Sequence, residues 1–542
     1  MLKQLTEEQK KWVEVTLNSL SLDEKILQTV CERYPYIAER CDAPAWLKQY
    51  PVGSIYVGNE VIDRDNSNSE RLRKEAEIIF SGAKIPVIGA SDFEQGVGGQ
   101  LTDDPYTYFP EAMAIASAGD PEAARTVGRL TALEAGTLGV HWTFGTVTDL
   151  ALEKDNPITL IRSYGSSPER ILPFLKAHIQ GLQDNGCAAC AKHFPGDGVD
   201  NRNQHFVTSF NPLNKAEWMN TYGKVWREVI DEGVMTIMVG HIAMPELENM
   251  DPVRQKYRPA TVSKRLMTGL LREELGFRGL IITDALGMNG FCSWADYDQR
   301  MLDCFNAGAD MFLWPETERF LVLIRSALAD GRADMERLDD AVRHVLELKA
   351  RLNLELFPKP CSENGKKCAA KIARNALNLL RNVEHTLPLK RRPEAKYYVL
   401  VTPSDSRAMA VLRPFADALC EYGKVDFSVF KEMKEEALST YDAVFLLNIA
   451  RARYTDCRGW EPCIWPFLKN GSCSKRIVVG FANPFFLYDV PSCDAYINAY
   501  SPHPESQRSA VRAIFGEFDF CGRCPIDIPY YVQEGSSLKL FT

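Results

Sequence analysis

A lone carboxylate follows an apolar run near the middle of the chain. Leu280 to Thr283 are apolar or β-branched, Asp284 comes directly after them, and no basic residue neighbours Asp284 in the sequence. A carboxylate in such a setting has the chemistry of a nucleophile toward an electrophilic carbon. Asp also caps helices well, so an N-cap of a following helix is the alternative interpretation.

Titratable side chains are dense in residues 192–205, after another apolar run. Two glycines and a proline predict a loop there rather than a helix. We expect Lys192 and His193, where strand and loop meet, to reach a polar ligand. His205 lies farther out, and an imidazole with an ordinary pKa of about 6.5 both gives and takes protons near neutrality. An ordinary surface histidine is the alternative interpretation.

Three more polar residues follow predicted strands or lie in their loops: Asp92, Arg162 and His241. Each alone also fits a solvated surface position. Together with Lys192 they form the kind of set that binds vicinal hydroxyls, because hydrogen bonds to charged groups are about twice as strong as neutral ones. The sequence therefore favours a sugar pocket.

Two other motifs carry less weight. The pairs Cys187/Cys190 and Cys521/Cys524 have the spacing of zinc or redox sites. The first pair lies in a predicted strand, where side chains three residues apart point to opposite faces, and no second ligand pair lies nearby, so we expect no metal. Glycine pairs such as Gly196 and Gly198 lack the third glycine and the helix of a dinucleotide loop, so we expect no nucleotide cofactor.

The elements that would position these residues recur as short apolar runs separated by helical stretches. This pattern predicts a (β/α)₈ TIM-type barrel, in which chemistry gathers where the strands end. The predicted strands are Val52 to Val57, Pro86 to Ala90, Val140 to Thr146, Ala188 to Phe194, Val234 to Gly240, Gly279 to Thr283 and Ala309 to Leu313.

The barrel is expected to span residues 1–355, ending with an amphipathic helix from Leu338 to Leu352. Residues 356–368 are rich in Pro, Gly, Lys and Cys and predict a linker. Residues 369–542 predict a smaller α/β sandwich domain that begins with a helix from Ala369 to Leu380. Its strands are expected at Tyr397 to Val401, Tyr441 to Asn448, Ile477 to Gly480 and Ala495 to Asn498.

The composition of the 542 residues is that of a globular protein, with 45% hydrophobic and 25% charged residues. A net charge of −9 gives no electrostatic footprint for a polyanion, so nucleic acid is not expected as a partner. No apolar run is long enough to span a membrane, and the polar N-terminus does not resemble a secretory signal, so we expect a cytoplasmic protein with its 15 cysteines reduced. The oligomeric state is left open.

Several motifs in the same order resemble glycoside hydrolase family 3, in its β-N-acetylglucosaminidase-like branch. The segment Lys192 to Gly198, followed by a three-residue box ending in His205, is similar to the signature of that branch. Asp92 to Gly96, Arg162 to Gly165, and Leu270 to Phe277 with Asp284 resemble further family motifs. The second half, with Ala482 to Pro484 and Gly516 to Glu517, resembles the two-domain form less specifically.

The resemblance implies an exo-acting, retaining enzyme that releases a terminal β-linked N-acetylglucosamine from a small-molecule carbohydrate. Asp284 would form a covalent glycosyl-enzyme and His205, paired with Asn203, would be the acid/base. The hydroxyls of the sugar would be bound by Asp92, Arg162, Lys192, His193 and His241.

One position departs from the family pattern. The family box reads Asp-Ser-His or Asp-Thr-His, whereas this chain has Asn203-Gln204-His205, and a neutral amide does not stabilise an imidazolium as a carboxylate does. Asp197 or Asp200 could substitute, His205 could work at lower pH, or catalysis could be poor; we expect activity to persist.

Four other functions stay open. A histidine acid/base does not repel phosphate, so the enzyme could be a phosphorylase. A β-glucosidase or β-xylosidase would take its acid from a glutamate of the second domain, for which Glu461 is the candidate. A sugar-binding protein without turnover is the non-enzymatic alternative.

Overall fold

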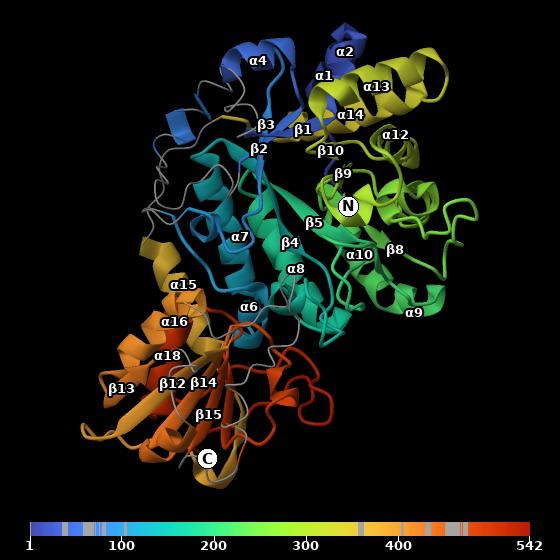
Figure 1. Ribbon diagram of the computed structural model, residues 1–542. Coiled ribbons are helices and arrows are strands. Elements are labelled where there is room, and N and C mark those ends of the chain that lie inside the picture. The colour runs from blue at the N-terminus through green and yellow to red at the C-terminus, as the bar shows by residue number, and fades with distance from the viewer. Residues whose placement is uncertain are drawn as a thin grey trace. The chain divides into compact units, whose positions relative to one another are not determined.

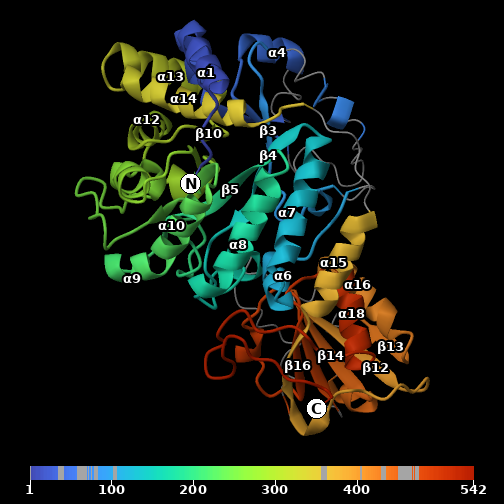
Figure 2. The ribbon, with the colours of Figure 1, turned by 180° about the vertical axis from the view of Figure 1, so that it is seen from behind.

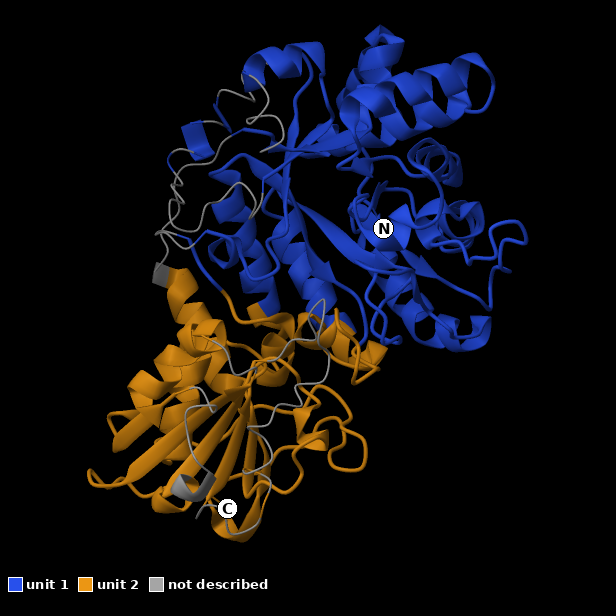
Figure 3. Ribbon diagram, in the orientation of Figure 1, with its two compact units in different colours: residues 1–108, 124–150, 172–363 blue, residues 109–123, 151–171, 364–542 orange. Residues whose placement is uncertain are grey.

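The computed structural model describes residues 2–34, 42–57, 70, 72–74, 76, 77, 83–101, 106–355, 363–402, 406–428, 435–449, 467, 469 and 475–541. These residues form two compact units, shown in different colours in Figure 3. The first unit comprises residues 1–108, 124–150 and 172–363, and the second comprises 109–123, 151–171 and 364–542. Two segments that the sequence places in the barrel thus group with the second unit. Most of the predicted linker lies outside the described residues.

The first unit is built around eight parallel strands in the order β10-β1-β2-β3-β4-β5-β7-β9. A parallel bridge between Ile282 and Met311 joins β9 to β10 and closes the ring. The TIM-type barrel predicted from the sequence is therefore confirmed. The strands are β1 Val30–Arg33, β2 Ser54–Tyr56, β3 Ile88–Ser91, β4 Val140–Val147, β5 Ala188–Phe194, β7 Thr236–Val239, β9 Leu280–Thr283 and β10 Phe312–Leu313.

Helices cover the outside of this barrel, and several begin where a side chain accepts from their first N–H groups. Capping boxes at Thr6, Ser21 and Asn214 start three of them. Figure 2 shows α7 and α8 side by side over the outer face of the sheet, and Figures 1 and 2 both place α1 beside α14. The helices of or entering this unit are α1 Glu7–Ser19, α2 Leu22–Gln28, α4 Ala43–Gln49, α7 Pro121–Gly136, α8 Pro168–Gln183, α9 Lys215–Asn220, α10 Tyr222–Glu232, the π-helix η4 Arg265–Glu274, α11 Asn289–Cys292, α12 Tyr297–Ala307, α13 Thr317–Ala329 and α14 Met335–Arg351.

The barrel interior is packed with side chains and is not a pore. Trp142 and Phe144 are fully buried there, and small residues on neighbouring strands, Ala90 and Ala188 among them, make room for their rings. The indole N–H of Trp142 donates to the hydroxyl of Thr236 at 2.8 Å, so the one polar atom of the ring is satisfied. A filled interior leaves only the ends of the barrel open to a ligand.

The second unit is an α/β sandwich around a six-stranded sheet in the order β11-β16-β15-β14-β12-β13. All pairs are parallel except β11 with β16. Separate apolar clusters form around Phe415 and Ile514 and around Phe486 and Tyr496. Its elements are α6 Ala112–Ala118, α15 Glu363–Asn375, β11 Asn378–Asn382, β12 Lys396–Thr402, α16 Ser406–Leu419, β13 Lys424–Phe427, β14 Ala443–Asn448, β15 Arg476–Gly480, β16 Ala495–Asn498 and α18 Pro504–Ile514.

The helix predicted from Ala369 to Leu380 is wrong at its C-terminal end. The helix α15 ends at Asn375 and the strand β11 begins at Asn378. Asn378 donates to the carbonyl of Gly522 at 2.9 Å, and its strand pairs with β16. These partners are distant in sequence, so the local apolar pattern did not reveal them.

The helices of the described residues include none with the length and apolar character of a membrane span.

Candidate active site

Polar side chains gather where the barrel strands end. Asp92 follows β3, Asp149 follows β4, Lys192 and His193 lie near the end of β5, His241 follows β7, and Asp284 follows β9. Because all eight strands are parallel, these residues share one end of the barrel. The structure thus brings Asp92, Lys192, His193, His241 and Asp284 of the predicted site to one end of the barrel.

Asp284 is partly exposed and does not cap a helix. The next helix, α11, begins at Asn289 with Met288 at its N-cap, so the N-cap interpretation is wrong. The Asp284 carboxylate accepts from the N–H of Ala285 at 2.7 Å. Burial alone would raise the pKa of Asp284, but the charges of nearby histidines, His193 foremost, hold it below its ordinary value. Asp284 is therefore an ionised carboxylate at neutral pH.

Lys192 is almost completely buried and lies between two carboxylates. Its Nζ is 2.7 Å from Oδ1 of Asp92 and 2.8 Å from Oε1 of Glu94. The hydroxyl of Tyr56 donates to Oδ2 of Asp92 at 2.9 Å. The cluster keeps charged donors and acceptors at fixed positions, which is what recognition of hydroxyl groups needs.

His193 is oriented by a buried carboxylate that the sequence analysis missed. Its Nδ1 is 2.7 Å from Oδ2 of Asp149, and Oδ1 of Asp149 accepts from the backbone N–H of His193 and Asp197. With Nδ1 held in this way, Nε2 of His193 is the ring nitrogen left for a ligand. Asp149 follows an apolar strand as Asp284 does, so the same strand-end pattern could have found it.

His205 is held in place by its neighbour and by two other loops. Its Nδ1 is 2.8 Å from Oδ1 of Asn203, and its carbonyl accepts from the N–H of Asn289 at 3.0 Å. The short strand β6, Ser209–Phe210, pairs with β8, Ile242–Ala243, and fastens the loop to the end of β7. A Cβ on Gly290 would lie 2.5 Å from the carbonyl oxygen of Gln204, so this close approach requires glycine. His205 also lowers the pKa of Asp284, which places the two in one electrostatic environment.

His241 is fully buried, and both of its ring nitrogens have partners inside the protein. Nδ1 is 3.0 Å from the hydroxyl of Thr261 and Nε2 is 3.0 Å from the carbonyl of Ala285. A carbonyl only accepts, so Nε2 carries the proton. Burial lowers the pKa of His241, which favours this neutral form. The contacts hold the backbone next to Asp284, and the contact of His241 with a sugar stays a prediction.

Gln204 is the middle residue of the box Asn203-Gln204-His205, which departs from the family pattern, and it connects two loops. Its Nε2 donates to Asp197 at 3.3 Å, and its Oε1 accepts from the N–H of His241 at 3.0 Å. Serine or threonine, which the family has at this position, is too short to span both partners. Asp200 accepts from the N–H of Phe210 at 2.7 Å, and Nδ1 of His205 is engaged by Asn203.

Two other predicted residues are not part of the first unit's described residues. Arg162 is at the end of a short 3₁₀ helix in segment 151–171 of the second unit, where it donates to the carbonyl of Ile158 at 3.3 Å. Its contact with a sugar stays a prediction. Glu461 lies outside the described residues.

Comparison with known proteins decides the family. The model of the glycosyl hydrolase family 3 N-terminal domain matches residues 21–348, which is more than half of the chain. The chain belongs to glycoside hydrolase family 3. This confirms the resemblance read from the motifs, and the protein is a family 3 glycoside hydrolase.

Relatives extend the match over both units of this family 3 protein. A β-N-acetylglucosaminidase/β-glucosidase of Cellulomonas fimi is 30% identical over 549 residues and covers 95% of each chain. The solved structure of a β-glucoside phosphorylase is similar with a TM-score of 0.86, 28% identity and 97% of each chain covered. A family 3 β-N-acetylglucosaminidase from Paenibacillus sp. FPU-7 shares the fold, with a TM-score of 0.80, 23% identity and coverage of 95% of this chain and 100% of the other.

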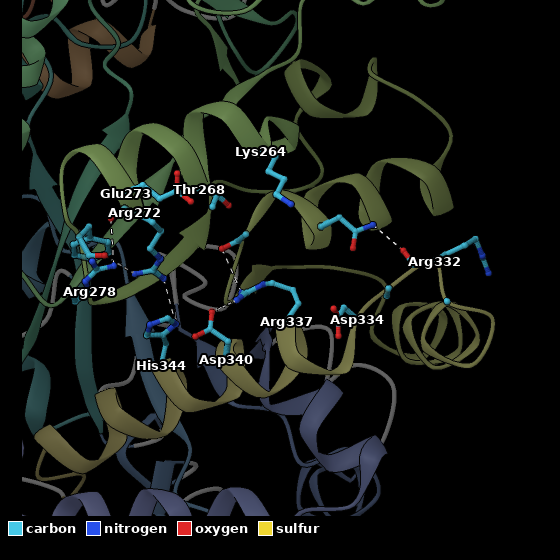
Figure 4. A pocket seen from close by; sticks show the side chains of 15 residues that line it. Lys264, Thr268, Arg272, Glu273, Arg278, Arg332, Asp334, Arg337, Asp340 and His344 are labelled. Atoms are coloured by element: carbon cyan, nitrogen blue, oxygen red, sulfur yellow. Dashed lines mark hydrogen bonds and ion pairs between the residues drawn. The ribbon is translucent and has the colours of Figure 1, made fainter.

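A hollow of about 880 Å³ lies between η4 and α14, at the end of the family 3 barrel where its strands begin (Figure 4). Behind it, the fully buried Asp310 accepts from Arg272, and also from Arg337 at 2.6 Å. Burial would raise the pKa of Asp310, but His344 and the two guanidinium groups hold it far below its ordinary value. Asp310, Asp340 and His344 have metal-ligand spacing, yet Arg337 also pairs with Asp340 at 2.5 Å. The carboxylates are thus already neutralised, and the cluster fastens η4 to α14.

Proposed function

We propose that the protein is an exo-acting retaining β-glycosidase that transfers a terminal β-linked N-acetylglucosamine through a covalent ester with Asp284. The observation that carries this proposal is an ionised carboxylate, Asp284, directly after β9 at the barrel end that also bears Asp92 and Lys192. An anion of this kind attacks an electrophilic carbon without prior deprotonation. The relative from Cellulomonas fimi, a β-N-acetylglucosaminidase/β-glucosidase, supports this choice of sugar.

In the first step an Asp284 oxygen forms a bond to the anomeric carbon as the bond from that carbon to the leaving oxygen breaks. His205 gives its proton to the leaving oxygen. Because Nδ1 of His205 faces the Asn203 oxygen and so carries a hydrogen, the transferred proton comes from Nε2. In the second step an acceptor attacks the anomeric carbon, the ester breaks, and His205 takes the proton of the acceptor. Asp92, Lys192 and His193 hold the hydroxyls throughout.

A second candidate function is phosphorolysis, in which phosphate replaces water as the acceptor. Asn203 favours it, because the amide beside His205 brings no negative charge toward an incoming anion. The structural relative that is a β-glucoside phosphorylase supports it as well. A β-glucosidase is the third candidate, because the relative from Cellulomonas fimi carries both glycosidase names.

The test incubates the enzyme with aryl β-N-acetylglucosaminide and aryl β-glucoside, each with and without phosphate. Hydrolysis yields free sugar, whereas phosphorolysis yields sugar 1-phosphate. Release of the N-acetylated sugar, with retained configuration and in excess of an Asp284→Asn variant, supports the proposal. A rate equal to that of Asp284→Asn on both substrates would overturn it and favour a sugar-binding protein.

A further inference from the structure

The mouth of the barrel is divided into two arcs of different chemistry. Asp284 follows β9 and Asp92 follows β3, and these strands are four apart in either direction around the ring of eight. One arc contains β4, β5 and β7, with Asp149, Lys192, His193 and His241 at their ends. The other arc contains β10, β1 and β2. Trp314 follows β10, β1 ends at Arg33 and β2 ends at Tyr56. We call these three residues the aromatic arc.

The aromatic arc is one connected set of contacts. The guanidinium carbon of Arg33 lies 4.2 Å from the ring centre of Trp314, and Trp314 meets Tyr56 edge-on with ring centres 4.9 Å apart. Tyr56 in turn donates its hydroxyl to Asp92 at 2.9 Å. Trp314 thus connects the strand beside the nucleophile to the hydroxyl-binding carboxylate on the opposite side.

Trp314 is placed next to Asp284 by the pairing of their strands. The carbonyl of Leu313, the residue before Trp314, accepts from the N–H of Leu286 at 3.1 Å. Trp314 also packs on the apolar interior of the barrel and is partly exposed, whereas Tyr56 is buried. Trp314 therefore is the member of the arc with ring surface available at the mouth.

A pyranose bound with its anomeric carbon at Asp284 and its opposite end at Asp92 presents different edges to the two arcs. One edge carries C2 and C3 with their hydroxyl or acetamido groups, and it matches the charged donors and acceptors of β4, β5 and β7. The other edge carries the ring oxygen and C5, whose only substituent is a hydroxymethyl group in hexoses and is absent in pentoses. This edge offers mostly C–H surface, which matches an aromatic ring.

We propose that Trp314, held by Arg33 and Tyr56, recognises the C5 substituent of the bound sugar and selects hexopyranosides over pentopyranosides. This inference rests on the proposed function, because it takes Asp284 as the residue that attacks the anomeric carbon. It assigns the discrimination between glucose-type and xylose-type sugars to a wall that contributes no group to bond breaking. A pocket that recognises one additional carbon typically gains about 10-fold or more in selectivity.

The test measures kcat/KM for aryl β-glucoside and aryl β-xyloside, which differ only at C5, in the wild type and in Trp314→Phe and Trp314→Ala. The indole nitrogen of Trp314 is buried without a hydrogen-bond partner among the described residues, so Trp314→Phe reduces ring surface without breaking a hydrogen bond. We expect the glucoside-to-xyloside ratio to fall about 10-fold in Trp314→Ala and less in Trp314→Phe. Competitive inhibition by gluconolactone and xylonolactone measures the same ratio without turnover.

The ratio of N-acetylglucosaminide to glucoside is the internal control, because C2 faces the other arc. It should stay constant in both variants. Equal losses on all substrates, an unchanged glucoside-to-xyloside ratio, or a wild type without preference would overturn the inference. Labelling of Asp284 by a fluorinated glycosyl fluoride in the same variants keeps the two proposals separate. Absence of label in the wild type refutes the function, whereas label with an unmoved ratio refutes only the role of Trp314.

Discussion

The ring of His205 is paired with an amide and not with an acid, its Nδ1 lying 2.8 Å from Oδ1 of Asn203. The amide oxygen fixes the orientation and tautomer of the imidazole as a carboxylate would. It adds no charge to stabilise the imidazolium. Asn203 therefore orients the ring of His205 without raising the pKa of the imidazole as a carboxylate would.

Replacing Asn203 by aspartate should therefore move the pH profile while keeping the geometry. A carboxylate within hydrogen-bond distance raises the pKa of an imidazole, by about one to three units for a close pair. We expect the alkaline limb of kcat/KM in Asn203→Asp to move upward by at least about one pH unit, with a smaller benefit from phosphate. Asn203→Ser, which adds no charge, is the control; coincident limbs in all three proteins would contradict this role.

Removing the Lys192 ammonium should weaken substrate binding more than removing a lysine outside the site. In the wild type the Nζ of Lys192 lies 2.7 Å from Asp92 and 2.8 Å from Glu94. Lys192→Met leaves these two carboxylates without their shared cation. We expect kcat/KM to fall by about 100-fold or more, mainly through KM, because the hydroxyl contacts lose their charged donor. Lys176→Met, which breaks a half-buried ion pair with Glu228 on the outer helices, is the matched control. Similar kinetics for both variants would refute the assignment.

The sequence predicted most of the barrel, because seven of its strands are apolar runs followed by turn residues. It missed β1, since Glu32 and Arg33 make half of Val30–Arg33 charged and a four-residue strand offers little periodicity. It found Asp284 and Lys192 because polar residues at strand ends stand out. It missed the links from Asp149 to His193 and from Tyr56 to Asp92, since each joins residues far apart in the chain.

The cluster at the strand-start end of the barrel should contribute stability and not activity. Arg272→Met removes one of the partners of Asp310 and leaves a buried carboxylate less compensated. Removing one member of a buried ion pair typically costs about 3 to 5 kcal/mol. We expect the Tm to fall by several degrees while kcat/KM at low temperature is retained. Arg325→Met, which breaks an exposed pair with Asp23, should change the Tm little. Equal shifts would contradict the prediction.

Glu32 should make the folded protein less stable as the pH rises. Burial raises its pKa from 4.5 to about 7, although Thr317 donates to it. Between these two values the folded state holds a proton that the unfolded state has lost, so stability falls as the pH increases through that window. Glu32→Gln should remove this loss. The free energy of unfolding of the variant minus that of the wild type should therefore be larger at pH 8 than at pH 4, by up to about 3 kcal/mol.

Thermal unfolding of both proteins across that pH range measures this difference, with the exposed Glu316→Gln as control. A gain for Glu32→Gln that does not change with pH would refute the assignment of the effect to Glu32.

In the proposed mechanism Asp284 becomes bonded to the anomeric carbon during the reaction. A fluorinated glycosyl fluoride has a good leaving group but a slow second step, so the ester accumulates and survives proteolysis. Mass spectrometry of the peptides should find the sugar on Asp284, with no label in Asp284→Asn. Label on any other residue, or turnover of the inactivator with no labelled peptide, would show that Asp284 is not the nucleophile.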